Sequence, residues 1–260
     1  MANPNDRLGE REEQVLVLVK AVPRPSQHHG ETVCCAGVTL SREWRRLYPV
    51  RFRQLKDNKF SRWQWVRYRW RPPTSDARKE SRHIFEDSLR PGKLMPEDER
   101  TDFLEPLIVP SVKVAAARGD SLALIRPHEV RFRWKQKPEK RISAEKTAYE
   151  SAAKQSSFFD SALAAIEPSP LEFRLSFRDE DGWHHHGCED WETTATYWKF
   201  AARHNPNLGL KRLDQFYNRD YPAKGMVLAL GTMAKRPKTW LLLGVIRLDK
   251  PTMGSLFPRA

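Results

Sequence analysis

The residues best suited to chemistry lie in one short segment, WHHHGCED at residues 183–190. His184, His186 and Cys188 recur at every second position, so a strand or a tight loop would point all three the same way. Imidazole nitrogens and thiolates are ligands that zinc prefers, and a structural zinc site usually needs four of them. The spacing therefore predicts a metal site at these three residues. No C-x-x-C pair supplies further ligands, and the alternative is a polar loop preceding a helix.

Two carboxylates and a cysteine offer other routes to catalysis. Asp190 and Glu192 would hold a catalytic metal ion if remote carboxylates joined them, although acids at a helix start usually complement the helix dipole. Cys34 follows the pair His28 and His29 and would act as a nucleophile if a histidine activated it. Buried cysteine is also a common core residue. The candidate catalytic residues are Cys34, His184, Asp190 and Glu192, and the sequence leaves open whether the protein is an enzyme.

Several common enzyme classes lack their signatures here. The chain contains no G-x-S-x-G, no P-loop, no G-x-G-x-x-G and no H-E-x-x-H. These motifs position the nucleophile of many hydrolases, the phosphates of nucleotides and the zinc of many proteases. Their absence argues against common hydrolases, NTPases and dinucleotide enzymes.

The strongest binding signal is a basic, aromatic stretch at residues 42–82. It holds 14 Lys and Arg against 4 Asp and Glu, so it carries +10 of the chain's net charge of +13. Eight aromatic residues are interleaved with these cations. Cations meet phosphates and flat rings stack on bases, so the pattern predicts a nucleic-acid interface. The alternative is a solvated charged face over an aromatic core.

Three segments alternate apolar with basic side chains, as strands with one buried face do. In residues 62–71, Val66, Tyr68 and Trp70 share one face and arginines the other; residues 129–135 and 171–178 repeat this pattern. In one sheet, the arginine rows would merge into a basic surface, which a basic link at 234–238 would border. The predicted nucleic-acid-binding residues are Arg42, Arg45, Arg46, Arg51, Arg53, Arg62, Trp63, Trp65, Arg67, Arg69, Arg71, Arg131, Arg133, Arg174, Arg178, Lys235, Arg236 and Lys238.

Short strands and a few helices would position these residues. Apolar runs predict strands at 14–22, 32–39, 121–125, 226–230 and 240–248, and helical patterns occupy 143–166 and 188–204. Pro110 makes the apolar run at 107–115 an edge strand or a helix start. A turn or short helix is expected near Trp44, and residues 72–105 are expected to hold few fixed elements. The fold class is α+β: a mostly antiparallel sheet with a partly closed small barrel of the PUA- or OB-like kind, and helices in the second half. The predicted division is a tail at 1–13, a β-rich basic region at 14–135 and an α+β region at 136–260, the last two either separate or continuous.

Composition limits the partners and the location. The sequence pI of about 9.8 favours nucleic acid or an anionic surface as partner. No apolar run reaches the roughly 18 residues that a membrane span needs, and the polar start does not resemble a secretory signal. Three cysteines make no disulfide framework, so a cytoplasmic location is expected. No cofactor is expected, with zinc as the alternative.

Three segments, GETVCCAGVT…WRRLYPVRFR, CEDWE…Y and LALGTMAKRPKTWLLLGV, resemble a family of uncharacterised prokaryotic proteins. The resemblance covers both halves of the chain; it implies a shared framework and brings no activity or site residue with it. The predicted function is therefore the one indicated by the residues: binding of DNA or RNA, with single strands or flipped-out bases favoured over intact duplex. Two alternatives stay open. One is a nuclease or base-modifying enzyme that uses residues 184–192 or Cys34; the other is a subunit of a ribonucleoprotein or defence complex with protein partners.

Overall fold

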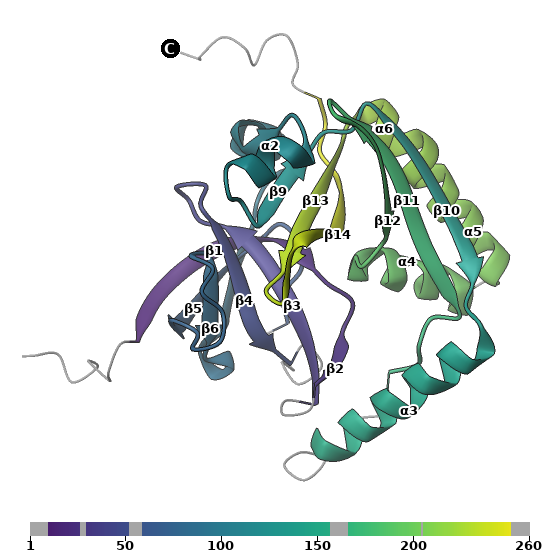
Figure 1. The fold of residues 1–260 in the computed structure, drawn as a ribbon, viewed down its shortest axis with the longest axis horizontal. Coiled ribbons are helices and arrows are strands. Elements are labelled where there is room, and N and C mark those ends of the chain that lie inside the picture. The colour runs from purple at the N-terminus through teal and green to yellow at the C-terminus, as the bar shows by residue number, and fades with distance from the viewer. Residues whose placement is uncertain (1–9, 27–29, 52–58, 157–165, 204, 251–260) are drawn as a thin grey trace, which may run out of the picture. The chain divides into compact units, whose positions relative to one another are not determined.

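A computed structural model describes residues 10–26, 30–51, 59–156, 166–203 and 205–250 (Figure 1). They form two compact units. The first comprises residues up to Met95 together with 138–168, and the second comprises 96–137 together with the chain from Ser169 onward. Each unit is thus built from two separate stretches, whereas the sequence suggested one boundary near residue 135. The predicted α+β class is confirmed, with strands mostly antiparallel and helices mainly in the second half.

The first unit contains a closed five-stranded barrel. Its strands follow the order β1 (Arg11–Lys20), β3 (Gly30–Val38), β4 (Trp44–Val50), β6 (Ser81–Ile84) and β5 (Gln64–Arg71), and β5 pairs again with β1. All neighbours are antiparallel except β4 and β6, which run parallel. Two short strands lie outside this ring: β2 (Arg24–Ser26) pairs with β3, and β7 (Arg90–Leu94) pairs with β5. The predicted small barrel is confirmed, and it closes completely.

Alternation along the strands fills the barrel. Val66, Tyr68 and Trp70 point inward, as predicted, and pack with Val15 and Leu47 among others. At Gly37 the strands approach so closely that a Cβ atom would lie 2.3 Å from the Leu16 carbonyl oxygen, so only glycine fits there.

Helix α3 (Glu139–Ser156) covers part of this barrel and belongs to the first unit. It packs against β2 and β3, and its Tyr149 hydroxyl donates a hydrogen bond of 2.7 Å to the Pro23 carbonyl oxygen. Ala152 and Ala153 are buried in the same contact region. The predicted helix at 143–166 is therefore present over its described part and begins earlier than predicted.

Several predicted elements were wrong because short strands take their identity from their pairing partners rather than from local pattern. Residues 44–50, expected as a turn or helix, form a barrel strand. Residues 72–105 contain β6, β7, a 3-10 turn at Glu86–Ser88 and helix α1 (Glu97–Leu104). Residues 11–13, expected in the tail, begin β1. Residues 107–115, expected as an edge strand or a helix start, contain both: the edge strand β8 (Ile108–Val109) follows the 3-10 turn Glu105–Leu107, and helix α2 (Val112–Ala117) comes next. Ser111 caps α2 through a 3.1 Å bond from the Val114 amide.

The second unit holds two sheets and a group of helices. One sheet has the order β14 (Arg236–Arg247), β13 (Met226–Met233), β9 (Leu122–Ile125) and β8. The other has the order β10 (Glu129–Gln136), β11 (Leu171–Asp179) and β12 (Gly182–Gly187). The helical elements are α4 (Trp191–Arg203), α5 (Pro206–Gln215), a π-helical turn at Phe216–Asp220 and α6 (Tyr221–Lys224). The predicted strands at 226–230 and 240–248 and the helix at 188–204 are thus present.

No helix in the described part of the chain is long and apolar enough to cross a membrane.

Candidate nucleic-acid interface

Two of the three predicted arginine rows lie side by side in the sheet β10–β11–β12. The strands are antiparallel neighbours, and their register places Arg133 directly opposite Arg174 and Arg131 opposite Ser176. The third row, on β5, lies in the barrel of the other unit, so the three rows do not share one sheet.

The inner face of this sheet is apolar and packs on helices of the same unit. Phe132 and Phe173 stack with ring centroids 5.9 Å apart. Phe173 meets Tyr197 of α4 at 5.6 Å, and Phe132 meets Tyr217 of the π-helical turn at 5.1 Å. Successive strand residues point to opposite faces. The residues that alternate with these rings on β10 and β11, such as Arg131, Arg133 and Arg174, therefore point outward. Figure 1 shows α4 and α5 beside the sheet.

The residues on the other side form what we call the outer sheet face. The side chains of Arg131, Lys135, Arg174 and Arg178 are each more than half exposed, and Arg133 is exposed too. The face consists of the cations Arg131, Arg133, Lys135, Arg174 and Arg178, the acids Glu129 and Glu172, and the residues Ser176, Trp183 and His185. Five cations against two carboxylates leave the face strongly positive.

Each acid of the outer sheet face is shared between two cations. Glu172 lies 2.7 Å from Arg174 and 3.5 Å from Lys135. Glu129 lies 3.1 Å from Arg178 and 4.0 Å from Arg131.

Arg133 has no carboxylate partner among the residues that the structure describes, although Arg174 lies directly across from it. Like charges placed opposite each other in a sheet destabilise it, so this pair favours an anion that would bridge them.

Two parallel rings lie beside these cations. The ring planes of Trp183 and His185 are within 6° of parallel, with centroids 6.5 Å apart. The Arg131 guanidinium lies 4.5 Å from the Trp183 ring centroid, and His185 Nδ1 lies 2.8 Å from Ser176 Oγ, which fixes the ring orientation. Trp183 is 38 % exposed. These two rings were absent from the predicted interface, although the alternation in GWHHHG carried the signal.

Many arginines of the basic stretch at 42–82 pair with acids of the first unit, some of which lie inside the stretch and some outside it. Arg46 is buried and lies 3.3 Å from Glu80, so a phosphate would not reach it. The others pair as Arg45 with Glu13 and Glu43, Arg51 with Glu86, Arg67 with Glu12, Arg69 with Glu10 and Asp87, Arg78 with Asp76, and Arg82 with Glu13. Acids outside the window therefore balance about half of the excess charge of +10 counted in it: Glu10, Glu12, Glu13, Glu86 and Asp87.

The remaining predicted contacts are scattered. Trp63 is buried, Arg62 and Trp65 are half-buried, and Arg42 is exposed in a turn with a left-handed backbone. Arg53 lies outside the described residues. Arg71 is exposed at the end of β5, and three exposed cations lie on the β13–β14 hairpin: Lys235, Arg236 and Lys238.

The histidine cluster divides between the two sides of β12. His184 and His186 point inward and stack on Phe177 at 4.9 and 5.7 Å. His184 Nε2 lies 2.9 Å from the buried Asp179 carboxylate, and burial lowers the pKa of His186. No group of three or more His, Cys, Asp and Glu side chains within the described ranges is arranged to hold a metal ion.

The catalytic candidates that follow β12 are held in structural contacts. Asp190 is buried and accepts hydrogen bonds from the amides of Glu192 and Val245, at 3.1 and 3.0 Å. Glu192 itself lies in the first turn of α4. Cys188 Sγ lies 3.6 Å from Thr193 Oγ1. Cys34 is half-buried in β3, and the histidines near it in sequence, His28 and His29, lie outside the described residues.

Cys188 is expected to react slowly with alkylating agents, because burial raises its pKa to about 12. At pH 8 its thiolate fraction is then about a thousandfold below that of an ordinary thiol. Iodoacetamide labelling followed by peptide mass spectrometry should show a rate for Cys188 at least a hundredfold lower in the folded chain than in urea. Similar rates in both conditions would show that burial does not suppress the reactivity of this thiol.

Comparison with known proteins identifies two families of unknown function. Two protein-family models match the chain, and both are described as domains of unknown function: DUF8758 over residues 11–106 and DUF8757 over residues 110–259. No curated protein matches the chain.

Proposed function

We propose, for a chain that belongs to the DUF8757 family and takes no assigned activity from it, that the outer sheet face binds single-stranded nucleic acid. Arginine and lysine side chains of the face would contact phosphates, and its two rings would stack on bases. The proposal includes both DNA and RNA, because nothing on the face distinguishes a 2′-hydroxyl group.

The observation that carries this proposal is the unneutralised charge around Arg133. Five cations share two carboxylates, and Arg133 faces Arg174 without a partner of its own in the described part of the chain. Two like charges that face each other destabilise the free protein. An anion bound between them would offset that cost. Guanidinium groups match the oxygens of a phosphate in a bidentate geometry, so phosphate is the anion that this pair favours.

The two rings favour a single strand over a duplex. Trp183 and His185 offer parallel stacking surfaces next to the cations, and bases expose their flat faces only when they are unpaired. Base stacking on an aromatic side chain contributes about 1–3 kcal/mol and tolerates any base sequence. The face is therefore expected to select strandedness more than sequence.

Residues of the first unit supply a second, weaker contact in this proposal. Arg67 and Arg71 are exposed on β5, and the 3.4 Å pair between Arg67 and Glu12 is itself exposed, so both charges remain accessible to a phosphate. A cytoplasmic location is part of the proposal as well, since Cys34, Cys35 and Cys188 are all free thiols.

A salt series tests the proposed function. Binding of the purified chain to fluorescent oligonucleotides, single-stranded and duplex, DNA and RNA, is expected to weaken steeply with salt. Five phosphate contacts on a single strand predict a slope of about −3.5 for log K against log salt concentration. Single strands should bind more tightly than duplexes of the same length. A flat salt dependence, or no binding at low salt, would overturn the proposal and favour a face that docks on the protein partners of a larger ribonucleoprotein.

A further inference from the structure

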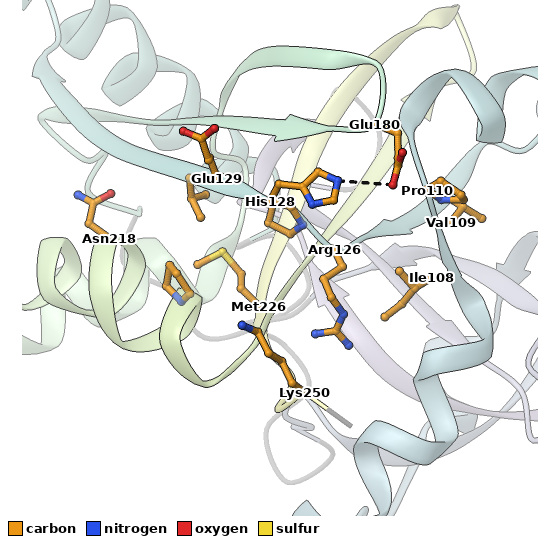
Figure 2. Close-up of a pocket in the computed structure, with 13 residues that line it drawn as sticks. Ile108, Val109, Pro110, Arg126, His128, Glu129, Glu180, Asn218, Met226 and Lys250 are labelled. Atoms are coloured by element: carbon orange, nitrogen blue, oxygen red, sulfur yellow. Dashed lines mark ion pairs between the residues drawn. The ribbon is translucent and has the colours of Figure 1, made fainter. Parts of the chain in front are cut away.

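A pocket of about 520 Å³ opens in the second unit, where six separate segments converge (Figure 2). Its volume falls within the range of small-ligand sites. The walls are largely apolar, with Ile108, Val109, Val130, Pro222 and Met226 among them. Polar side chains complete the lining: Arg126, His128, Glu129, Glu180, Asn218 and Lys250.

The wall formed by β10 is held firmly in place. The Phe132 amide donates a 2.7 Å hydrogen bond to Asn218 Oδ1, and Asn218 Nδ2 donates to the Phe132 carbonyl oxygen at 3.2 Å. Asn218 belongs to the π-helical turn, a distortion that is frequent at functional sites. The pocket is therefore bordered by a rigid connection between the outer sheet and the helices behind it.

Arg126 contributes a partly exposed cation to the pocket lining. Its Nη2 lies 2.5 Å from Glu105 Oε2 and its Nη1 donates to the Leu248 carbonyl oxygen at 3.4 Å. Its Nε is buried and has no hydrogen-bond partner in the described structure. The Nε atom has almost no accessible surface, so the pocket meets the positive charge and the partly exposed remainder of the Arg126 side chain. Lys250 adds a second cation, exposed and without a carboxylate partner among the described residues.

Acceptors are present in the same pocket. Glu180 lies 3.6 Å from His128, and the dashed line in Figure 2 marks this exposed pair. Glu129 belongs to the pocket lining, and its carboxylate pairs with Arg178 and Arg131 of the outer sheet face. The pocket and the outer sheet face therefore adjoin at Glu129.

We infer that this pocket receives one nucleobase of a strand held on the outer sheet face. The inference rests on the proposed function and adds a specific site to it. A bare anion would meet the two glutamates as well as the cations, whereas a base presents both donors and acceptors on its edge. The base edge would accept from Lys250 or the exposed part of the Arg126 guanidinium and donate to Glu180, and its flat faces would lie against the apolar walls. A base turned out of the strand fits such a pocket sterically and chemically.

Binding of single nucleoside monophosphates tests the inference, since they reach the pocket without needing the sheet face. Calorimetry is expected to show one site per chain with a Kd below about 1 mM for at least one base. Arg126→Gln should weaken that binding at least tenfold, because it removes a charged hydrogen-bonding group from the pocket lining. Lys250→Ala, at an exposed position that leaves the fold intact, should weaken it about threefold. Arg118→Gln, an exposed cation outside the pocket, is the matched control and should change nothing.

The outcomes separate the pocket from the sheet face. A chain that binds oligonucleotides but no monophosphate at about 1 mM would overturn the pocket and leave the proposed function standing. Inorganic phosphate that displaces the nucleotide as effectively as the nucleotide itself would also overturn the inference, because the site would then recognise only charge. Binding of neither strand nor monophosphate would remove both proposals together.

Discussion

Replacing Arg133 and Arg174 together with alanine is expected to weaken oligonucleotide binding at least tenfold, because hydrogen bonds to charged groups contribute about 1.5–3 kcal/mol each. The salt slope should become shallower by about 1.4, which corresponds to two lost contacts on a single strand. The melting temperature should stay the same or rise, since the variant removes two like charges that face each other across β10 and β11. Fluorescence anisotropy across a salt series and thermal denaturation measure the two effects.

The barrel offers a control with three arginines instead of two. Replacing Arg67, Arg69 and Arg71 by alanine removes more charge, but Arg69 lies 2.6 Å from Glu10 and Arg67 lies 3.4 Å from Glu12. We therefore expect a loss of only about twofold to threefold from this variant. A larger loss from the barrel variant than from the sheet variant would move the principal interface to β5. Unchanged affinity in the folded sheet variant would remove the outer sheet face from the proposal.

The second large effect is on stability. Trp70→Ala is expected to lower the free energy of unfolding of the first unit by about 3–5 kcal/mol, because it empties a large site in the barrel core. Trp70 is 7 % exposed and packs with Tyr68 and Val66 inside the barrel. The Arg82 guanidinium lies 3.8 Å from the Trp70 ring centroid and would lose this contact as well. Urea denaturation followed by circular dichroism measures the change.

Trp65→Ala is the control for this stability prediction. Trp65 lies on the same strand but points to the opposite face and is half-buried, beside a hollow that Gln14, Leu40 and Lys93 also line. Its replacement should cost less than about half as much as that of Trp70. Equal costs, or a change below about 1 kcal/mol for Trp70, would mean that the barrel core tolerates a cavity there.

The fold was predictable where strands alternate clearly. Residues 64–71, 129–136 and 171–179 each have one apolar face, and that pattern alone indicated which side chains are buried. Residues 81–84 and 90–94 carry no such alternation, and they form strands because barrel neighbours offer backbone hydrogen bonds. The barrel order and its closure depend on those long-range pairings, which no local pattern reveals.

The candidate site was only partly predictable for a related reason. Arg131, Arg133, Arg174 and Arg178 were identified from alternation, but the acids that balance the stretch at 42–82 lie mostly outside it. The net charge counted in this window therefore overestimated the number of barrel arginines that are available to bind a partner. The pocket beside Glu129 had no sequence signal at all, because its lining comes from segments far apart along the chain.

The interleaving of the two units has a consequence for how the chain is made. Synthesis passes from the first unit to the second after Met95, returns at Pro138 and leaves again after Pro168. The barrel strands are therefore complete on the ribosome before their covering helix α3 exists, and β10 emerges before that helix while its partner β11 emerges after it. Neither unit can be completed until a segment of the other unit has been translated. A nascent chain halted near residue 137 would hold a barrel without the contact between Tyr149 and Pro23, and one edge strand without its neighbour.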